Sequence, residues 1–178
     1  MIGGIDCWDG SERMRLIIRP YANEDRAAMT ALYRRAWHDT YDAVDGAVAI
    51  DRVIAALLDG EPPEMFSLPP GDVALVTEFG RRLIGGIRGH PRPSGVHLSG
   101  MYVAPDAQRC SAGSAMLATL LERFPPDTVV RADVRPTSLA ARQFYARHGF
   151  VEIGRSRADV GGNHWVDVIE LRRGAAQA

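Results

Sequence analysis

The sequence of 178 residues contains no lysine, and all 21 of its basic residues are arginine. Without lysine there is no Schiff-base amine, which excludes pyridoxal-phosphate enzymes and lysine-dependent aldolases. The phosphate-binding lysine of nucleotide-binding loops and the lysine of protein kinases are excluded in the same way. The 22 acidic residues nearly cancel the arginines, so the net charge is −1. This charge argues against a general nucleic-acid binder, which would present a basic surface.

Cysteine is nearly absent too, and Cys7 and Cys110 lie far apart in the chain. Two distant cysteines provide neither a disulfide framework nor a cysteine-rich zinc site, and this usage is typical of a reducing, cytoplasmic compartment. The five histidines form no HExxH-type motif, so we expect no metal. No apolar run is long enough to span a bilayer, and residues 1–13 lack the apolar core of a secretory signal, so we expect no membrane partner.

The remaining composition is that of an ordinary globular protein, 46% hydrophobic and 24% charged. We expect a flexible N-terminal tail over residues 1–13, one domain over 14–173 and a C-terminal tail over 174–178. Apolar periodicity and turn residues predict an α/β protein in which antiparallel hairpins flank a strand–helix–strand unit. The expected elements are a strand over 16–20, helices from about 23 and over 48–58, a loop over 61–72, a hairpin of 73–78 with 82–88, a strand over 96–103 with a bulge near Gly100, a helix over 111–123, a strand over 128–134, a helix over 138–147 ended by Gly149, and a hairpin of 150–157 with 164–172.

The most informative segment runs from Met101 to Leu117. A strand leads into a loop of small residues, and the loop leads into an amphipathic helix. The free N–H groups at a helix N-terminus carry partial positive charge, and small residues let a phosphate approach the backbone. The segment predicts either a phosphate site or a tight strand-to-helix turn that simply requires small residues.

Two blocks of this sequence resemble the GCN5-related N-acetyltransferase (GNAT) family. The acetyl-CoA signature of that family, Val-x-Pro followed by Gln-x-x-Gly-x-Gly, is matched at Val103, Pro105, Gln108, Ser111 and Gly113. Residues 133–150 resemble the end of that family's domain, where Asn-x-x-Ala-x-x-Phe-Tyr precedes Gly-Phe. The resemblance covers about residues 14–173.

The resemblance implies the GNAT acyl-CoA N-acyltransferase fold, a mixed, mostly antiparallel sheet of about seven strands flanked by about four helices. It also implies that an acetyl group passes from acetyl-CoA to a primary amine of a small molecule or peptide by direct attack, and it makes a homodimer a fair expectation. It assigns acetyl-CoA binding to Met101, Tyr102, Val103, Gln108, Arg109, Cys110, Ser111, Ala112, Gly113, Ser114, Ser138 and Tyr145.

Two of these positions depart from the family's pattern. Ser111 replaces a glycine, and it would cost about 1–2 kcal/mol if the backbone there is left-handed, unless its hydroxyl binds a phosphate. Ser138 replaces an asparagine that contacts the cofactor arm in relatives. Arg109 is either a phosphate ligand or a solvent-exposed side chain, and Cys110 is interpreted as a small loop residue without chemistry.

Acyl transfer from a thioester needs oxyanion donors, a proton acceptor and a proton donor. The expected oxyanion donors are backbone N–H groups of residues 101–103, because a bulged strand leaves some N–H groups unpaired. Tyr145 matches the tyrosine that protonates the departing sulfur in relatives, and a phenol with a pKa of about 10 holds its proton at neutral pH. The alternative is a tyrosine that only packs its helix on the sheet.

The proton acceptor is left open among three residues. Asp133 occupies the position of a catalytic glutamate in some ribosomal-protein acetyltransferases of the family. His97 lies on the strand that faces the cofactor and has a suitable ordinary pKa, and Glu78 is a weaker candidate. For Asp133 and His97, the alternative is a surface residue bonded to a neighbour.

An amine acceptor would bind on the far side of the same strands, where Trp37, His38, Thr40 and Tyr41 cluster. Two rival functions remain open. One is a non-catalytic acyl-CoA-binding or regulatory module on the same fold. The other is a Rossmann-type nucleotide protein, which is disfavoured because repeated βαβ units and a G-x-G-x-x-G motif are absent.

Overall fold

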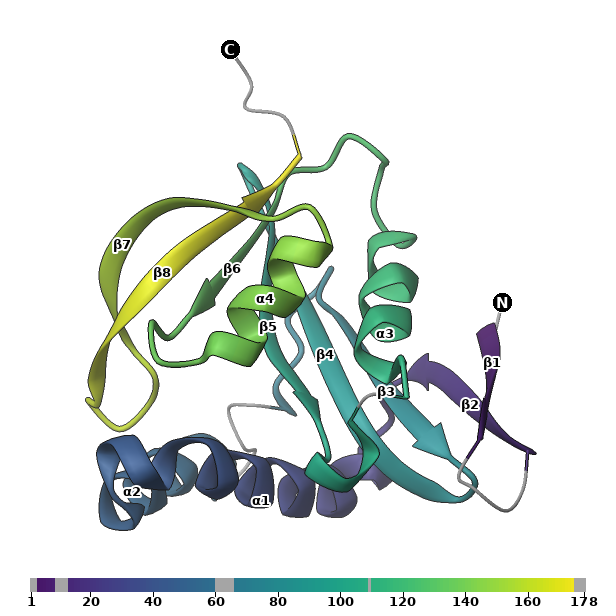
Figure 1. The fold of residues 1–178 in the computed structure, drawn as a ribbon, viewed down its shortest axis with the longest axis horizontal. Helices are drawn as coiled ribbons and strands as arrows, with labels where there is room; N and C mark the ends of the chain where they lie inside the picture. Colours follow the sequence, from purple (N-terminus) through teal and green to yellow (C-terminus); the bar gives the residue numbers. More distant parts are fainter. Residues whose placement is uncertain (1–2, 9–12, 60–65, 109, 175–178) are drawn as a thin grey trace.

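A computed structural model of the chain describes residues 3–8, 13–59, 66–108 and 110–174. In Figure 1, one twisted sheet carries α3 and α4 over its front, while α1 and α2 run across its lower end. The elements, in chain order, are β1 (Gly3–Trp8), β2 (Arg13–Pro20), the 3-10 turn η1 (Asn23–Asp25), α1 (Arg26–Asp45), α2 (Ala47–Leu58), β3 (Val73–Phe79), β4 (Arg82–Arg92), β5 (Gly95–Val103), the 3-10 turn η3 (Pro105–Ala107), α3 (Ala112–Leu121), β6 (Val130–Val134), α4 (Leu139–Arg147), β7 (Val151–Asp159) and β8 (Trp165–Arg173).

The described strands follow the spatial order β1-β2-β3-β4-β5-β6-β8-β7. Only β5 and β6 pair in parallel, and every other neighbouring pair is antiparallel. The predicted α/β fold, with a mixed sheet and four helices, is confirmed, and β2 to β8 are its seven expected strands. The structure also has the predicted hairpins, and Gly149 ends α4 with a positive φ of 79°.

The N-terminal segment differs from the prediction. Within the segment expected to be a tail, residues 3–8 form β1, which pairs antiparallel with β2 as an eighth strand at the sheet edge. Strand pairing is made by main-chain hydrogen bonds, so a segment without an apolar pattern can add to an exposed sheet edge and give no signal in the sequence. Of the predicted C-terminal tail, residues 175–178 lie outside the described part of the chain.

Two adjacent glycines of β4 show that helices pack on both faces of the sheet. A Cβ added to Gly85 would lie 3.0 Å from Cε of Met116 on α3, and one added to Gly86 would lie 2.6 Å from Cε of Met29 on α1. Because successive strand residues point to opposite faces, α1 and α3 cover opposite sides of β4. Helices therefore cover both faces of the sheet centre. The largest fully buried side chains of the core, from strands and helices together, include Leu16, Ile50, Ile54, Ile84, Ile87, Leu117, Leu120 and Ile169.

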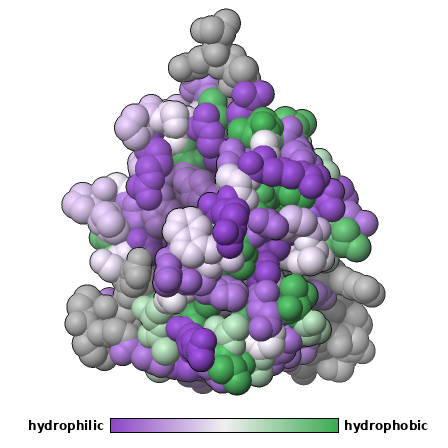
Figure 2. Space-filling view, turned by 90° about the vertical axis from the view of Figure 1, so that its left-hand side faces the viewer, coloured by the Kyte–Doolittle hydropathy of each residue, from purple (hydrophilic) through white to green (hydrophobic). Residues whose placement is uncertain are grey.

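The β7–β8 hairpin forms the outer edge of the sheet beside α2. Hydrophilic side chains cover most of the face that Figure 2 shows, with apolar ones scattered among them. The outer strand β7 is exposed along most of its length, whereas Val166, Val168 and Ile169 of β8 are buried. No helix in the described part of the chain is long and apolar enough to cross a membrane.

The sheet divides between β5 and β6. These strands pair only from Val96 with Val130 to Leu98 with Ala132. Beyond this point β5 continues along β4 as far as Val103, while β6 continues along β8. The division leaves one edge of the last β5 residues without a neighbouring strand, and α4 lies across the opening in Figure 1.

Candidate active site

A cavity of about 810 Å³ lies where β5 and β6 separate. Four segments form its walls: the end of β5, the loop and first turn of α3, the start and inner side of α4, and the middle of α1. The lining residues are Ala36, Thr40, Tyr41, Val44, Met101, Tyr102, Val103, Pro105, Ala107, Gln108, Ser111, Ala112, Gly113, Ser114, Thr137, Ser138, Leu139, Ala140, Ala141, Gln143, Phe144, Tyr145 and Arg147.

The bulge predicted near Gly100 lies at this opening. Arg88 is the register partner of Ser99, and Gly86 is the partner of Tyr102, so two residues of β5 oppose one of β4. Gly100 has a φ of 59°, a left-handed conformation that glycine adopts at little cost. The extra residue bends β5 away from β6 and shapes the inner wall of the cavity.

The bulged end of β5 directs backbone donors into the cavity. The N–H of Ala104 donates to the carbonyl of Ile84 on β4 (N–O 2.7 Å). Because the N–H groups of successive strand residues point to opposite edges, those of Met101 and Val103 point toward the gap. On that same edge, the Val103 carbonyl accepts a hydrogen bond from Nε2 of Gln108 (3.4 Å). The edge expected to supply oxyanion donors therefore faces the cavity.

The second wall is the N-terminus of α3. Ser111, the residue before the helix, has φ 63° and ψ 5°, so the left-handed backbone considered for this position is present. No side-chain hydrogen bond caps this end among the described residues. The first-turn N–H groups, which have no partner within a helix, are therefore available to an anion at the cavity.

Most of the predicted cofactor-binding residues share this cavity, with two exceptions. Cys110 does not line it, and its thiol donates to the carbonyl of Ala107 (S–O 2.8 Å). Arg109 lies outside the described residues. Gly113 is also needed for packing, since an added Cβ would lie 3.3 Å from both Met101 and Phe144.

Most of the cavity wall that α4 and the residues before it form, from Thr137 to Arg147, was not predicted from the sequence. Arg147 supplies a positive charge at the cavity from the last turn of α4. The sequence did contain one signal for Arg147. Its spacing from Ser138 and Tyr145 places it on the same predicted helix, whose N-terminus was already assigned to the cofactor. Only the position of α4 across the opening makes them one surface.

Tyr145 projects from α4 into the same cavity and is only 7% exposed. Its hydroxyl lies 3.6 Å from Sδ of Met101, and its ring packs edge-on against Phe150 (centroids 4.9 Å apart). Burial raises the pKa of Tyr145 above its ordinary value of about 10. The phenol therefore keeps its proton at neutral pH beside the strand that carries the oxyanion donors.

The predicted proton acceptors His97 and Asp133 lie against one another. Nε2 of His97 is 3.1 Å from Oδ2 of Asp133, and their side chains are 34% and 36% exposed. Neither lines the cavity; the two join β5 and β6 at the point where these strands separate. Glu78 lies on β3, with β4 between it and the strand that lines the cavity, and it is bound by Nε of Arg19 (2.9 Å), so its position does not suit a proton acceptor there.

Of the predicted acceptor-site residues on α1, only some reach the cavity. Thr40 and Tyr41 line it. Trp37 is 8% exposed and belongs to the core, where it packs against Tyr41 (centroids 5.7 Å apart). Nδ1 of His38 instead pairs with Asp42, 2.9 Å from its Oδ1, outside the cavity.

A half-buried ion pair fixes the Tyr41 wall. Two bonds join the guanidinium of Arg135 to the carboxylate of Asp45, one of them 2.8 Å from Nη2 to Oδ1, and Cζ of Arg135 lies 4.9 Å from the Tyr41 ring centre. The hydrogen bonds from Arg135 hold the pKa of Asp45 below its ordinary value. Nε2 of His164 lies 3.6 Å from the same carboxylate. The pair therefore ties the end of α1 to the segment before α4 and to the β7–β8 turn.

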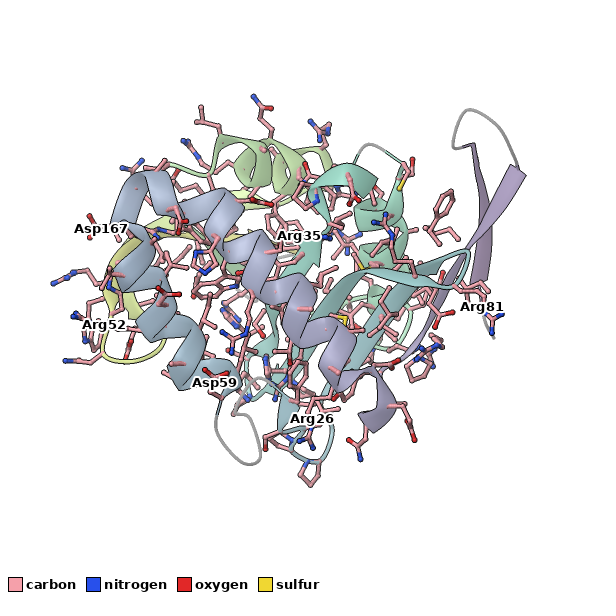
Figure 3. The ribbon with its side chains drawn as sticks, turned by 90° about the horizontal axis from the view of Figure 1, so that it is seen from below. Arg26, Arg35, Arg52, Asp59, Arg81 and Asp167 are labelled. Atoms are coloured by element: carbon pink, nitrogen blue, oxygen red, sulfur yellow. The ribbon has the colours of Figure 1, made fainter. Side chains whose placement is uncertain are left out.

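A weaker contact joins α1 to the loop before α3. Arg35, labelled in Figure 3, projects from α1, and its Nη2 lies 3.9 Å from Oδ1 of Asp106 on η3. Arg82 also binds Asp106, with Nη1 2.5 Å from Oδ2. No cluster of three or more histidine, cysteine, aspartate or glutamate side chains in the described residues could hold a metal ion.

A divided sheet, a bulged strand, an open helix N-terminus and a buried tyrosine in one cavity define an acyltransferase of the acyl-CoA type. The chain belongs to the acetyltransferase (GNAT) family, whose family model matches residues 27–150. The sequence resemblance is thereby confirmed, and the protein is an acetyl-CoA-dependent N-acetyltransferase. The Rossmann alternative is excluded.

Solved structures show the same fold. A GCN5-related N-acetyltransferase from Rhodopseudomonas palustris is 22% identical, with a TM-score of 0.70 over 89% of this chain and 94% of that one. The PaiA N-acetyltransferase from Thermoplasma acidophilum, solved with coenzyme A, is 18% identical, with a TM-score of 0.69 over 90% and 99%. A ribosomal-protein-alanine N-acetyltransferase from Brucella melitensis is 24% identical, with a TM-score of 0.62 over 89% and 99%. No curated protein matches this sequence significantly.

The left-handed backbone at Ser111 yields a stability prediction. Ser111→Gly removes a left-handed penalty of about 1–2 kcal/mol but adds about 0.5–1 kcal/mol of unfolded-state entropy, so we expect a net gain of about 0.5–1 kcal/mol. Urea unfolding measures the difference. Ser114→Gly, which places glycine inside α3, is the matched control and should destabilise the protein.

The same variant tests the Ser111 hydroxyl. If the hydroxyl binds a phosphate, Ser111→Gly should weaken acetyl-CoA binding in calorimetry although the protein is more stable. A Ser111→Gly protein that is less stable than the parent would contradict the assigned left-handed strain.

Proposed function

We propose that this chain transfers an acetyl group from acetyl-CoA to a primary amine of a small molecule or peptide by direct attack. The observation that carries the proposal is the single cavity shared by the β5 edge, the α3 N-terminus and the Tyr145 hydroxyl. Anion binding, oxyanion stabilisation and proton donation can therefore act on one ligand.

The walls suit the two ends of the acyl donor. The pyrophosphate would lie at the first turn of α3, where Ser111, Ala112 and Gly113 expose backbone rather than bulky side chains. The extended arm would follow the free edge of β5, with Ser138 on the α4 side. When bound, the donor supplies an acetyl thioester, the activated form of the group to be transferred.

The chain's own groups would then act in sequence. The N–H groups of Met101 and Val103 would stabilise the negative oxygen that forms when the amine attacks the carbonyl carbon. The phenol of Tyr145 would donate its proton to the departing sulfur. The raised pKa of Tyr145 keeps this proton in place at neutral pH until the thiolate forms.

The proton lost by the amine would go to the His97–Asp133 pair. A carboxylate hydrogen-bonded to an imidazole fixes the ring orientation and stabilises the imidazolium, so the two act as one acceptor. The pair is partly exposed, which lets the proton pass on to water. It lies outside the cavity wall, so its contact with the amine would need a bridging water.

The amine would enter beside Thr40 and Tyr41 on α1. Neither side chain carries a fixed charge, so this wall does not specify a charged acceptor. The alternative considered from the sequence is a non-catalytic acyl-CoA-binding module, and the Ser111 and Ser138 departures were its motivation. That module would share the cofactor cavity but would transfer nothing.

A thiol-release screen separates the two functions. Acetyl-CoA should release coenzyme A faster in the presence of an accepted amine, in a panel of small amines, polyamines, aminoglycosides and peptide N-termini. Calorimetry on the same protein checks that acetyl-CoA binds. Binding with no amine-dependent release across the panel would favour the non-catalytic module and contradict the proposal.

Tyr145→Phe tests the proton donor. Loss of the hydroxyl should lower turnover about 100-fold, the usual effect of removing a general acid, while acetyl-CoA binding changes little because the ring remains. Tyr21→Phe is the matched control, since Tyr21 does not line the cavity. Unchanged turnover in Tyr145→Phe would remove this residue from the mechanism.

Asp133→Asn and His97→Ala test the proton acceptor through the pH dependence of kcat/KM. A general base acts unprotonated, so activity should rise with pH through its titration, and a variant lacking the base should lose that step. Because the residues are hydrogen-bonded, we expect both variants to alter the same limb of the profile. A profile that keeps its shape in both variants would assign the proton to another group.

A further inference from the structure

Three side chains on the α1 side of the sheet form a row that resembles the core of a serine hydrolase site. Oγ of Ser99 on β5 lies 2.6 Å from Nε2 of His90 on β4, and Nδ1 of His90 lies 2.8 Å from Oδ2 of Asp72, just before β3. A Cβ on Gly89 would face Leu120 of α3, so the neighbouring His90 points to the opposite face. A hydroxyl, an imidazole and a carboxylate in this order are a nucleophile, its base and the group that orients the base.

The carboxylate at the end of the row is firmly held. The Asp72 side chain is 4% exposed, and its Oδ2 accepts hydrogen bonds from Nε (3.1 Å) and Nη2 (2.8 Å) of Arg88. Arg88 also donates to the carbonyl of Ser67. A carboxylate can only accept, so His90 carries its proton on Nδ1, and its Nε2 is the acceptor for the Ser99 hydroxyl.

The imidazole is ready to accept a proton. His90 is 13% exposed. Burial, and then the positive charge of Arg88, hold the pKa of His90 below its ordinary value, although Asp72 acts in the opposite direction. The ring is therefore neutral at neutral pH and can take the proton of Ser99.

The position of Ser99 relative to the bulge completes the arrangement. Ser99 is the last regular β5 residue before Gly100, whose φ is 59°. The Gly100 carbonyl accepts a bond from the Tyr33 hydroxyl (3.1 Å), and the backbone turns sharply there. A nucleophile placed directly before such a turn has unpaired backbone N–H groups beside it, which can stabilise an oxyanion.

We propose that Ser99 is an acyl-accepting nucleophile, activated by His90 and Asp72, for small acyl esters and for the acyl thioester that the neighbouring cavity binds. Acceptance from the thioester rests on the proposed function, whereas acceptance from a small ester does not. Ser99 is half-buried and directly follows Leu98, the last β5 residue that pairs with β6. His97 is the register partner of His90 but hydrogen-bonds Asp133 rather than a member of the row.

The reaction consumes only the acyl donor and water. The Ser99 proton moves to Nε2 of His90 while Oγ bonds to the acyl carbon, and the C–O or C–S bond of the donor breaks. The leaving alcohol or thiol takes the proton from His90. A water then gives a proton to His90 and its oxygen to the acyl carbon, and the ester bond to Ser99 breaks as Oγ recovers the proton. The products are a carboxylic acid and free enzyme.

The absence of lysine makes the test unusually clear, because the chain has no side-chain amine to be acetylated. The protein is mixed with p-nitrophenyl acetate, or with acetyl-CoA without an amine, and quenched in acid. Peptide mapping should find one acetyl group on Ser99 that hydroxylamine removes, as it removes esters but not the amide of an acetylated N-terminus. Ser99→Ala should lack it, and Ser156→Ala on the exposed β7 should retain it.

Variants of the base and its partner test the activation. His90→Gln should slow ester hydrolysis about 100-fold, within the range for loss of a general base, and Asp72→Asn should slow it too. Ser99→Cys should carry a thioester at the same position, so acyl acceptance can be followed even if Ser99→Ala folds poorly.

Two results would overturn the proposal. One is equal hydrolysis of p-nitrophenyl acetate by the parent and Ser99→Ala, with no ester at residue 99. The other is that the Ser99, His90 and Asp72 variants change only the pH profile of amine acetylation, which would make the row a proton relay. An ester on Ser99 without amine-dependent thiol release would support this inference and contradict the proposed amine transfer, so the two failures are distinguishable.

Discussion

The separation of β5 from β6 is the constraint on which the rest of the site depends. Three register pairs join the strands, and the bulge that follows at Gly100 turns β5 away. Backbone donors that a continuous sheet would pair are left facing a gap, and a buried unpaired N–H is costly unless a ligand or water satisfies it. The cavity, the position of α4 over it and the setting of Tyr145 all follow from a sheet that opens at this point.

The arginines of this protein mainly form structural ion pairs and do not build a positively charged surface for an anionic ligand. Arg19 binds Asp25 and Glu78, Arg88 binds Asp72, and Arg135 binds Asp45. The Arg19–Glu78 and Arg135–Asp45 pairs join segments distant in sequence, and the planar fork of the guanidinium suits such bridging. An anionic donor would be bound instead through the N-terminus of α3, which explains how a nearly neutral chain without lysine can serve a polyanionic substrate.

Local structure was predictable wherever a single residue type determines the backbone conformation. The β3–β4 hairpin, the bulge at Gly100 and the helix end at Gly149 follow from turn and left-handed preferences readable in sequence. The strand β1 was not predictable, because pairing at a sheet edge uses only main-chain groups. The contact of His97 with Asp133 was not predictable either. Each residue was identified separately, and only the parallel register of β5 and β6 brings them into contact.

The sequence by itself determined the class of protein: the two GNAT-like blocks, the small-residue turn before α3 and the tyrosine of α4 are local features carried by contiguous residues. Only the tertiary structure decided which side chains act together. Asp72, His90 and Ser99 come from three segments and carry no shared motif, yet strand pairing places them in one hydrogen-bonded row. Sequence separation hides such groups, because cross-strand neighbours are set by register, and register is fixed by the whole packed sheet rather than by any one segment.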